Sequence, residues 1–290
     1  MSVYDIVTER IIQQLESGVA PWHKPWTSSE PSNFVSKKAY RGINVFLLSC
    51  SGYASPYFLT YKQCSQLGGQ VRKGEHGHLV VFWKWNNPVR KLDEQDNDTP
   101  PAKTRNAPIL RYYTVFNVEQ CDGLTLPETG RTIEPLEAAE AIVSGYANAP
   151  KIQGGQQASY SPTQDTVTMP ERNTFESAPA YYSTIFHELA HSTGHKSRLN
   201  RTEIAESMIN FDSNDYSREE LVAEMGAAML CGKAGLSETV QQSAAYLKHW
   251  LGRLKEDSRL IVMAAASAQK AADWILGQRP EVEAKANDQY

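Results

Sequence analysis

Two histidines and one glutamate stand within five consecutive residues, in the order His187-Glu188-Leu189-Ala190-His191. On an α-helix, His187 and His191 lie one turn apart on the same face, so both imidazoles can bind a single metal ion. A zinc ion in such a site lowers the pKa of a neighbouring water molecule towards neutrality, and Glu188 is placed to accept the proton. The pattern therefore predicts the zinc site and general base of a metallopeptidase. The alternative is a core helix that carries two histidines by chance.

The surrounding residues predict that this segment is a helix lodged in a core. Pro179 falls where the first turn of a helix accepts proline. Ile185, Phe186 and Leu189 then give the helix an apolar face. An active-site helix needs such a face, because its burial fixes the direction of the polar side chains on the other side.

A zinc site with two histidines needs a third protein ligand. Glu220 and Glu224 lie one turn apart on one face of a second predicted helix. One carboxylate can bind the metal while the other accepts a hydrogen bond from the free ring nitrogen of a ligand histidine. The segment resembles the downstream helix of gluzincin peptidases, in which the first carboxylate binds zinc, and this implies Glu220 as the ligand. Glu224 is then the orienting residue or the alternative ligand.

A competing interpretation exists for Glu220. Ser217 and Glu220 have the spacing of a capping box, which would engage the Glu220 side chain with the backbone at the start of its own helix. For the metal itself we expect Zn²⁺, with Mn²⁺ as an acceptable substitute, because a set of two histidines and a glutamate is not strongly selective.

Length and composition bound the organisation of the chain. With 290 residues, 41% of them hydrophobic, the chain is near the size at which one core divides, so we expect two domains. Residues 1–15 mix acidic and basic side chains with apolar ones, unlike a secretory signal, and no apolar run reaches membrane-spanning length. These features predict a cytoplasmic protein with no membrane partner. Cys50, Cys64, Cys121 and Cys231 lack the spacing of a disulfide framework or a metal site and are expected to be reduced thiols.

Charge and aromatic content divide the chain into unlike halves. Residues 1–120 hold 14 Lys and Arg against 10 Asp and Glu, whereas residues 121–290 hold 15 against 23. The first half also contains 16 of the 28 aromatic residues. Cations interleaved with rings suit single-stranded nucleic acid, because cations track phosphates and rings stack on unpaired bases. The candidates that fall in predicted loops are Trp22, Lys24, Trp26, Lys38, Arg41, Lys62, Arg72 and Lys73.

Three other aromatic residues of the first half receive a different interpretation. Phe82, Tyr113 and Phe116 lie in predicted strands. Alternation along a strand favours burial of such rings in a core over contact with a ligand.

Hydrophobic periodicity places most of the regular elements. In the first half it predicts a helix over 4–15, a helix-like run over 45–48, and strands over 79–85 and 110–118 that pair as a long hairpin around a polar excursion at 86–108. In the second half it predicts helices over 136–147, 238–255 and 259–276, and a hairpin formed by 158–160 and 165–170. The edge strand of that second hairpin could bind an extended substrate chain by strand addition.

Short motifs along nearly the whole chain match one known family. They are Ala20-Pro21-Trp22 with Pro25-Trp26, Tyr40-Arg41-Gly42-Ile43-Asn44, the run from Val71 to Glu75, Tyr181-Tyr182 with the run from His187 to Gly194, the run from Glu219 to Glu224, and the run from Ala268 to Asp273. In these motifs the chain resembles the plasmid-borne antirestriction proteins of the ArdC type. The resemblance implies an α+β protein of two domains. We expect a mixed α/β domain that binds single-stranded DNA over 1–125, a linker over 126–134, and a mainly helical zincin-like metallopeptidase domain with a small sheet over 135–290.

The resemblance also implies a function, the protection of incoming conjugative plasmid DNA from host restriction. Single-stranded DNA would be one partner, and an unidentified protein substrate, such as a host restriction component, would be another. Two alternatives stay open: a binding protein that shields DNA and has a non-catalytic metal site, and a free regulatory metallopeptidase that cleaves a repressor or toxin. A purely structural metal site has no need of a base, so Glu188 favours the peptidase hypotheses.

Overall fold

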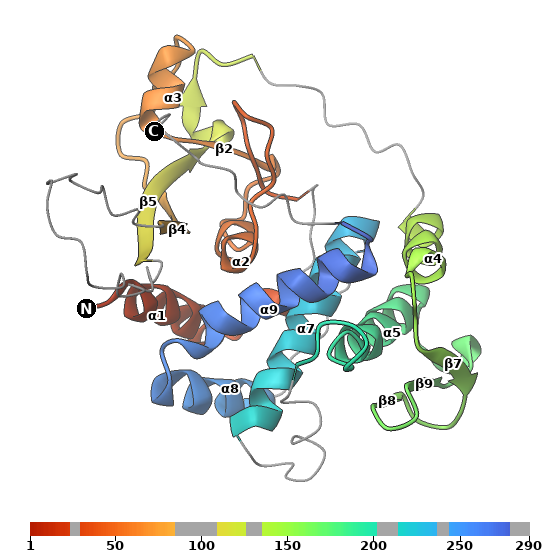
Figure 1. Cartoon of the computed structure of the whole chain (residues 1–290). Coiled ribbons are helices and arrows are strands. Elements are labelled where there is room, and N and C mark those ends of the chain that lie inside the picture. Colours follow the sequence, from red (N-terminus) through yellow and green to blue (C-terminus); the bar gives the residue numbers. More distant parts are fainter. Residues whose placement is uncertain (24–29, 85–108, 126–134, 202–213, 237–243, 279–290) are drawn as a thin grey trace, which may run out of the picture.

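The computed structural model describes residues 1–23, 30–84, 109–125, 135–201, 214–236 and 244–278. These residues form an α+β protein with a mixed sheet on the N-terminal side and a mainly helical C-terminal side (Figure 1). The fold class that the sequence predicts is thereby confirmed. None of the described helices is both long enough and apolar enough to span a membrane. None of the four cysteines, all of which lie within the described residues, forms a disulfide.

The N-terminal sheet has four strands in the order β1 (Ser32–Asn33), β2 (Tyr57–Leu59), β5 (Ile109–Asn117) and β4 (His78–Lys84). β1 and β2 are parallel, and the other neighbours are antiparallel. The pairing of β4 with β5 confirms the predicted hairpin, and its register sets Val80 opposite Tyr113. Around this sheet lie α3 (Tyr61–Gln66), the 3-10 turn η2 (Val118–Gln120), and the short pair of β3 (Gln70–Val71) with β6 (Cys121–Asp122).

Helix α2 (Ile43–Ser49) covers the free edge of β4. It starts after Gly42, whose φ of 58° lies in the left-handed region that glycine adopts without strain. The Asn44 side chain donates to the Val81 carbonyl at 2.7 Å and accepts from the Val81 N–H at 2.7 Å. The amide thus satisfies two backbone groups that an edge strand would otherwise leave unpaired.

The C-terminal half consists of helices and a three-stranded sheet, which lies at the edge of the molecule beside α5 (Figure 1). The helices are α4 (Pro135–Gly145), α5 (Ala178–Ser192), α7 (Asn214–Ala234), α8 (Ala244–Glu256) and α9 (Leu260–Ile275), with a 3-10 turn η3 (Arg172–Thr174) before α5. The sheet has the order β7 (Lys151–Gly154), β9 (Thr166–Met169) and β8 (Ser159–Ser161). β8 and β9 form the predicted antiparallel hairpin, whereas the sequence does not predict β7. All four residues of β7 are exposed, so it lacks the apolar pattern that marks a strand.

The two halves share one apolar core. Helix α1 (Val3–Glu16) buries Ile11 and Leu15 and packs against α8 and α9 (Figure 1). Trp22, in the 3-10 turn η1 (Pro21–His23), is only 3% exposed, and its ring centroid lies 6.0 Å from that of Trp250. The prediction that Trp22 offers an exposed ring for stacking is therefore wrong, because α8 from the other half covers it.

Two of the family-like motifs also contact each other across the halves. The Arg41 guanidinium forms an ion pair with the buried Asp273 of α9, and the Gly42 N–H donates to Gln269 Oε1 at 2.9 Å. The domain boundaries at 1–125 and 135–290 stay a prediction, and the expected linker 126–134 lies outside the described residues.

Candidate metal centre

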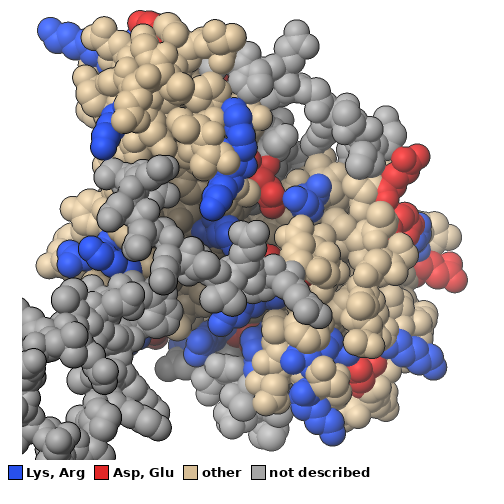
Figure 2. Space-filling model, turned by 45° about the horizontal axis from the view of Figure 1, so that its top comes forward, with Lys and Arg blue, Asp and Glu red and all other residues tan. Residues whose placement is uncertain are grey.

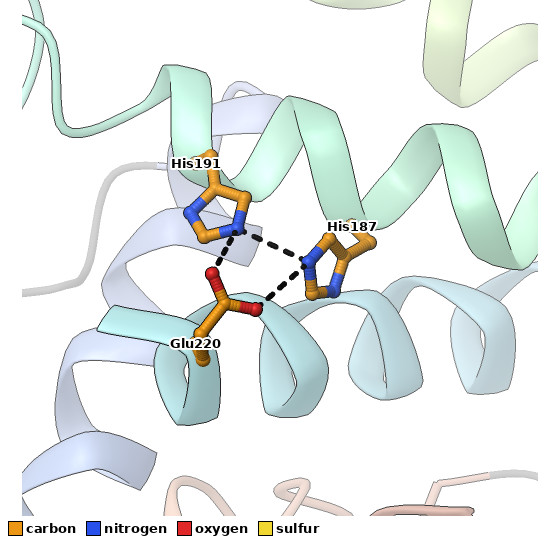
Figure 3. Close-up of side chains that lie close together, drawn as sticks. All are labelled: His187, His191 and Glu220. Atoms are coloured by element: carbon orange, nitrogen blue, oxygen red, sulfur yellow. Dashed lines mark hydrogen bonds and ion pairs between the residues drawn. The ribbon is translucent and has the colours of Figure 1, made fainter. Parts of the chain in front are cut away.

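Helix α5 carries the two histidines in a fixed orientation. Its N-cap is Ser177, whose Oγ accepts a hydrogen bond from the Ala180 N–H at 3.1 Å. Phe186 and Leu189 are fully buried, as the apolar face predicts. This burial leaves His187 and His191 on the side of the helix that meets α7 (Figure 3).

Helix α7 brings a carboxylate to the histidines. The helix begins at Asn214, so Ser217 lies inside it and cannot act as its N-cap. This position argues against the capping-box interpretation of Glu220. Leu221 and Met225 are fully buried and fix the rotation of α7, while Glu220 points to the two imidazoles (Figure 3).

The distances among these side chains fit a shared metal ion. The Nε2 atoms of His187 and His191 lie 3.1 Å apart, and each lies 3.5 Å from a carboxylate oxygen of Glu220. Ligand atoms about 2.0–2.1 Å from a tetrahedral zinc ion are separated by roughly 3.3 Å. Among the described residues, these three form the one cluster with metal-ligand geometry. The side chains of His187 and Glu220 remain 24% and 26% exposed, so the cluster is open to solvent on one side, as a catalytic site requires.

Glu219 contacts the ring of His191 on the side away from His187 and Glu220. The sequence did not predict a role for this residue. Its Oε1 lies 3.2 Å from His191 Nδ1, and its carboxylate accepts two hydrogen bonds from Arg201, at 2.7 and 3.0 Å. Burial lowers the pKa of His191, but the contact with Glu219 outweighs it and raises that pKa overall. A carboxylate at Nδ1 favours the tautomer with its proton on Nδ1, which turns the lone pair of Nε2 towards the metal position. The only signal in the sequence was that Glu219 precedes Glu220.

Glu224 faces a different partner. Its Oε2 accepts a hydrogen bond from the Tyr246 hydroxyl at 2.5 Å, and that hydroxyl accepts one from Trp22 Nε1 at 2.8 Å. The structure therefore places Glu219, and not Glu224, at the free ring nitrogen of His191. This corrects the orienting role expected for Glu224, which also lies outside the three-residue cluster.

Glu188 lies beside the cluster in a sheltered position. It is 8% exposed, and burial raises the pKa of its carboxyl group, although His187 and His191 counteract the effect. The backbone of Tyr160 in β8 also lies close enough to lower the pKa of this carboxyl group. The edge strand of the small sheet is thus adjacent to the expected general base.

Arg198 ties that edge strand to the end of α5. Its guanidinium is 1% exposed and forms an ion pair with Asp165, in the turn between β8 and β9. It also donates from Nε to the Ser192 carbonyl at 2.7 Å. The Tyr160 hydroxyl in turn donates to Asp165 Oδ1 at 2.9 Å. These bonds hold β8 against the helix that carries His187 to His191.

The residues expected to bind nucleic acid differ in their exposure and in their partners. Lys38, Lys62 and Lys73 are exposed, whereas Lys24 and Trp26 lie outside the described residues. The Arg41 side chain is 49% exposed but paired with Asp273. That of Arg72 is 45% exposed and forms ion pairs with Glu75 and Asp122. Figure 2 shows Lys and Arg side chains around a hollow in the middle of one face of the molecule.

The expectation that Phe82, Tyr113 and Phe116 are buried in a core holds only in part. Tyr113 and Phe116 are half-buried, but Phe82 is 42% exposed. The expectation that Phe82 fills a core is wrong, because the sheet is covered over only part of its length.

A helix with the His187 to His191 pattern and a glutamate on a following helix define a zincin-like metallopeptidase domain. A family model described as a zincin-like metallopeptidase matches residues 137–267, and one described as the N-terminal domain of anti-restriction factor ArdC matches residues 1–116. The crystal structure of the antirestriction ArdC protein from plasmid R388, in its metal-free form, is 41% identical with a TM-score of 0.73, over 95% of this chain and 97% of that one. Its Mn(II)-bound form is also 41% identical, with a TM-score of 0.72, over 96% and 98%. The chain belongs to the ArdC antirestriction family.

The curated relatives include one protein of similar length and two longer proteins. An uncharacterized protein y4eC of Sinorhizobium fredii is 38% identical, over 97% of this chain and 94% of that protein. Two proteins named DNA primase TraC, from Escherichia coli, are 39% and 36% identical over 94% of this chain. The chain spans only 27% and 20% of the length of those two proteins.

Proposed function

We propose that this protein is a zinc-dependent peptidase that binds single-stranded DNA without sequence preference and protects incoming conjugative plasmid DNA from host restriction in the cytoplasm. The observation that carries the proposal is the convergence of His187, His191 and Glu220 beside a buried Glu188. A structural metal site needs ligands but no neighbouring base. The protein substrate would be a component of the host restriction system.

In this proposal His187, His191 and Glu220 hold the metal, and Glu188 moves the proton. Bound zinc would supply a Lewis acid that polarises the peptide carbonyl and lowers the pKa of the attacking water. Glu188 accepts the proton from that water and returns it to the leaving amine. Glu219 keeps His191 in its ligand tautomer. Mn²⁺ is an acceptable substitute, which the Mn(II)-bound form of the relative from plasmid R388 supports.

The edge strand β8 would position the substrate chain. It has no strand partner on its outer side within the described sheet, and its Tyr160 contacts Glu188 through the backbone. An extended peptide can add to such an edge through main-chain hydrogen bonds, which orient the chain with little dependence on its sequence.

The proposed DNA binding rests on the N-terminal half. That half matches the N-terminal ArdC model and carries an excess of Lys and Arg over Asp and Glu. Lys38, Lys62 and Lys73 are exposed and available for phosphates, with Arg41 and Arg72 as partly exposed additions. Tethering the metal site to DNA would direct the peptidase to proteins that act on the entering strand.

The decisive test is restriction protection in cells by Glu188→Gln. This substitution removes the base but leaves all three metal ligands, so we expect wild-type metal content and loss of protection. Glu137→Gln, an exposed position on α4, is the matched control and should protect fully. Full protection by Glu188→Gln would instead support the DNA-shielding protein with a non-catalytic metal site.

A further inference from the structure

Two aromatic rings lie side by side on the outer part of the N-terminal sheet. Phe82 on β4 is 42% exposed, and Tyr113 on β5 is half-buried. Their ring centroids are 5.5 Å apart, and the ring planes are inclined by 59°. An exposed phenylalanine side chain contributes little to the stability of the fold, because its ring stays in contact with water.

The strand register places two cations on the same face. Arg111 is directly opposite Phe82, and Lys84 is opposite Ile109. Because side chains alternate along a strand, Phe82 and Lys84 share one face of β4, and Arg111 and Tyr113 share the same face of β5. Lys84 and Arg111 are both exposed. We call Phe82, Lys84, Arg111 and Tyr113 the β4–β5 platform.

The opposite face of these strands is turned inward. Leu110 is 7% exposed and belongs to the main core, and the Trp83 ring lies 6.3 Å from that of Tyr4 in α1. On the platform side, Val80 and Val115 are covered by a small cluster that includes Phe58 and Leu48. Among the described residues, that cover reaches Tyr113, which packs partly against the cluster, but leaves Phe82 exposed, so the platform lies at the end of the packed face.

The charge of the platform indicates the kind of partner that it fits. Neither β4 nor β5 contains Asp or Glu, so no carboxylate from these two strands offsets Lys84 and Arg111. Paired rings between cations match a strand whose bases are unpaired and whose phosphates run alongside. In a duplex the bases stack on one another and leave no face for the rings.

We propose that the β4–β5 platform binds single-stranded DNA, with bases stacked on Phe82 and Tyr113 and phosphates beside Lys84 and Arg111. The proposal rests on the single-stranded DNA binding proposed above and gives it a location. It replaces the stacking role expected of Trp22, which is buried.

The test measures binding of the full chain to a fluorescently labelled oligothymidylate by anisotropy over a salt series. Phe82→Ala should weaken binding by about 5- to 150-fold with an unchanged salt slope, because one stacking contact is lost. Lys84→Gln with Arg111→Gln should weaken binding and reduce the salt slope by roughly 1.4, since two phosphate contacts are lost. Phe82→Trp should retain binding.

Tyr112→Ala is the matched control. Tyr112 adjoins Tyr113 in β5 and is 52% exposed, but it points to the opposite face of the strand. We expect binding within about twofold of the wild type, because this ring is outside the platform and a whole stacking contact is worth more. Thermal unfolding of each variant identifies folding defects, and the charge variants test the platform even where Phe82→Ala is unstable.

The outcomes separate the location from the binding itself. If the wild type binds and the platform variants bind equally well, or lose no more affinity than Tyr112→Ala, the platform is overturned while DNA binding stands. Altered self-association in the platform variants with unchanged DNA binding would assign the surface to a second copy of the chain. If the wild type does not bind single-stranded DNA at low salt, the platform and the proposed DNA binding both fail.

Discussion

Replacement of Glu219 by glutamine should weaken metal binding without touching a ligand. The wild-type carboxylate accepts a hydrogen bond from His191 Nδ1 and two from Arg201, and its side chain is 4% exposed. Glutamine keeps the shape but removes the charge that strengthens the His191 bond. Loss of such a supporting carboxylate lowers metal affinity about 10- to 100-fold, or roughly 1.4 to 2.8 kcal/mol.

The same substitution leaves Arg201 without its anion. The Arg201 side chain is 11% exposed, so it has little water to replace the lost partner. Breaking a buried pair in this way costs about 3 to 5 kcal/mol of folding free energy. The double variant Glu219→Gln with Arg201→Gln removes both charges and should recover part of the stability. It should not recover the metal affinity, because the carboxylate at His191 is still absent.

Competition with a chromophoric chelator measures the metal affinity, and thermal unfolding of the metal-free protein measures the stability. Glu224→Gln is the matched control, since it removes a carboxylate from the same helix that contacts Tyr246 and not His191. We expect it to keep nearly wild-type metal affinity. Wild-type affinity in Glu219→Gln together with a large loss in Glu224→Gln would refute the assignment of Glu219 as the orienting residue.

Three further predictions concern separate parts of the molecule. Glu220→Gln should lose most of its metal on dialysis, because only two histidines remain, and metal analysis showing one equivalent would exclude Glu220 as a ligand. Tyr246→Phe should destabilise the protein by about 1 to 3 kcal/mol in denaturant unfolding, because its half-buried hydroxyl both donates and accepts a hydrogen bond. Burial raises the pKa of Asp165, but Arg198 outweighs it and holds that pKa below its usual range. The pair therefore stabilises the fold above the unfolded pKa of about 3.9 and loses this effect as the pH falls further, so the stability deficit of Asp165→Asn should shrink in acid. A deficit that stays constant with pH would contradict this cause.

Local patterns were sufficient for much of the fold and for part of the site. His187, Glu188 and His191 lie on one helix, and the 3.6-residue period of a helix predicts that the two histidines share a face. The β4–β5 hairpin likewise depends on two neighbouring strands with strong alternation. Glu220 needed the assumption that the next amphipathic helix packs beside the first, and also the resemblance to gluzincin peptidases, because the residues alone left Glu224 as an alternative.

The features that the sequence did not predict depend on contacts between distant segments. Trp22 is buried by α8, more than 200 residues away, as its bond to Tyr246 shows. Glu219 gains its role from the rotation of α7 and from Arg201, which no local pattern links to it. Alternation showed which face of its strand Phe82 occupies. Whether other segments bury that face at Phe82 depends on the packing of α2 and its neighbours.

Metal-edge anomalous scattering from crystals of the metal-loaded protein tests the proposed centre most directly. The proposal predicts one strong peak between α5 and α7, within about 2.0–2.2 Å of His187 Nε2, His191 Nε2 and a carboxylate oxygen of Glu220. Glu188 should lie next to the peak without ligating it. A peak ligated by other residues, or no peak between these helices in a protein loaded with metal, would contradict the account.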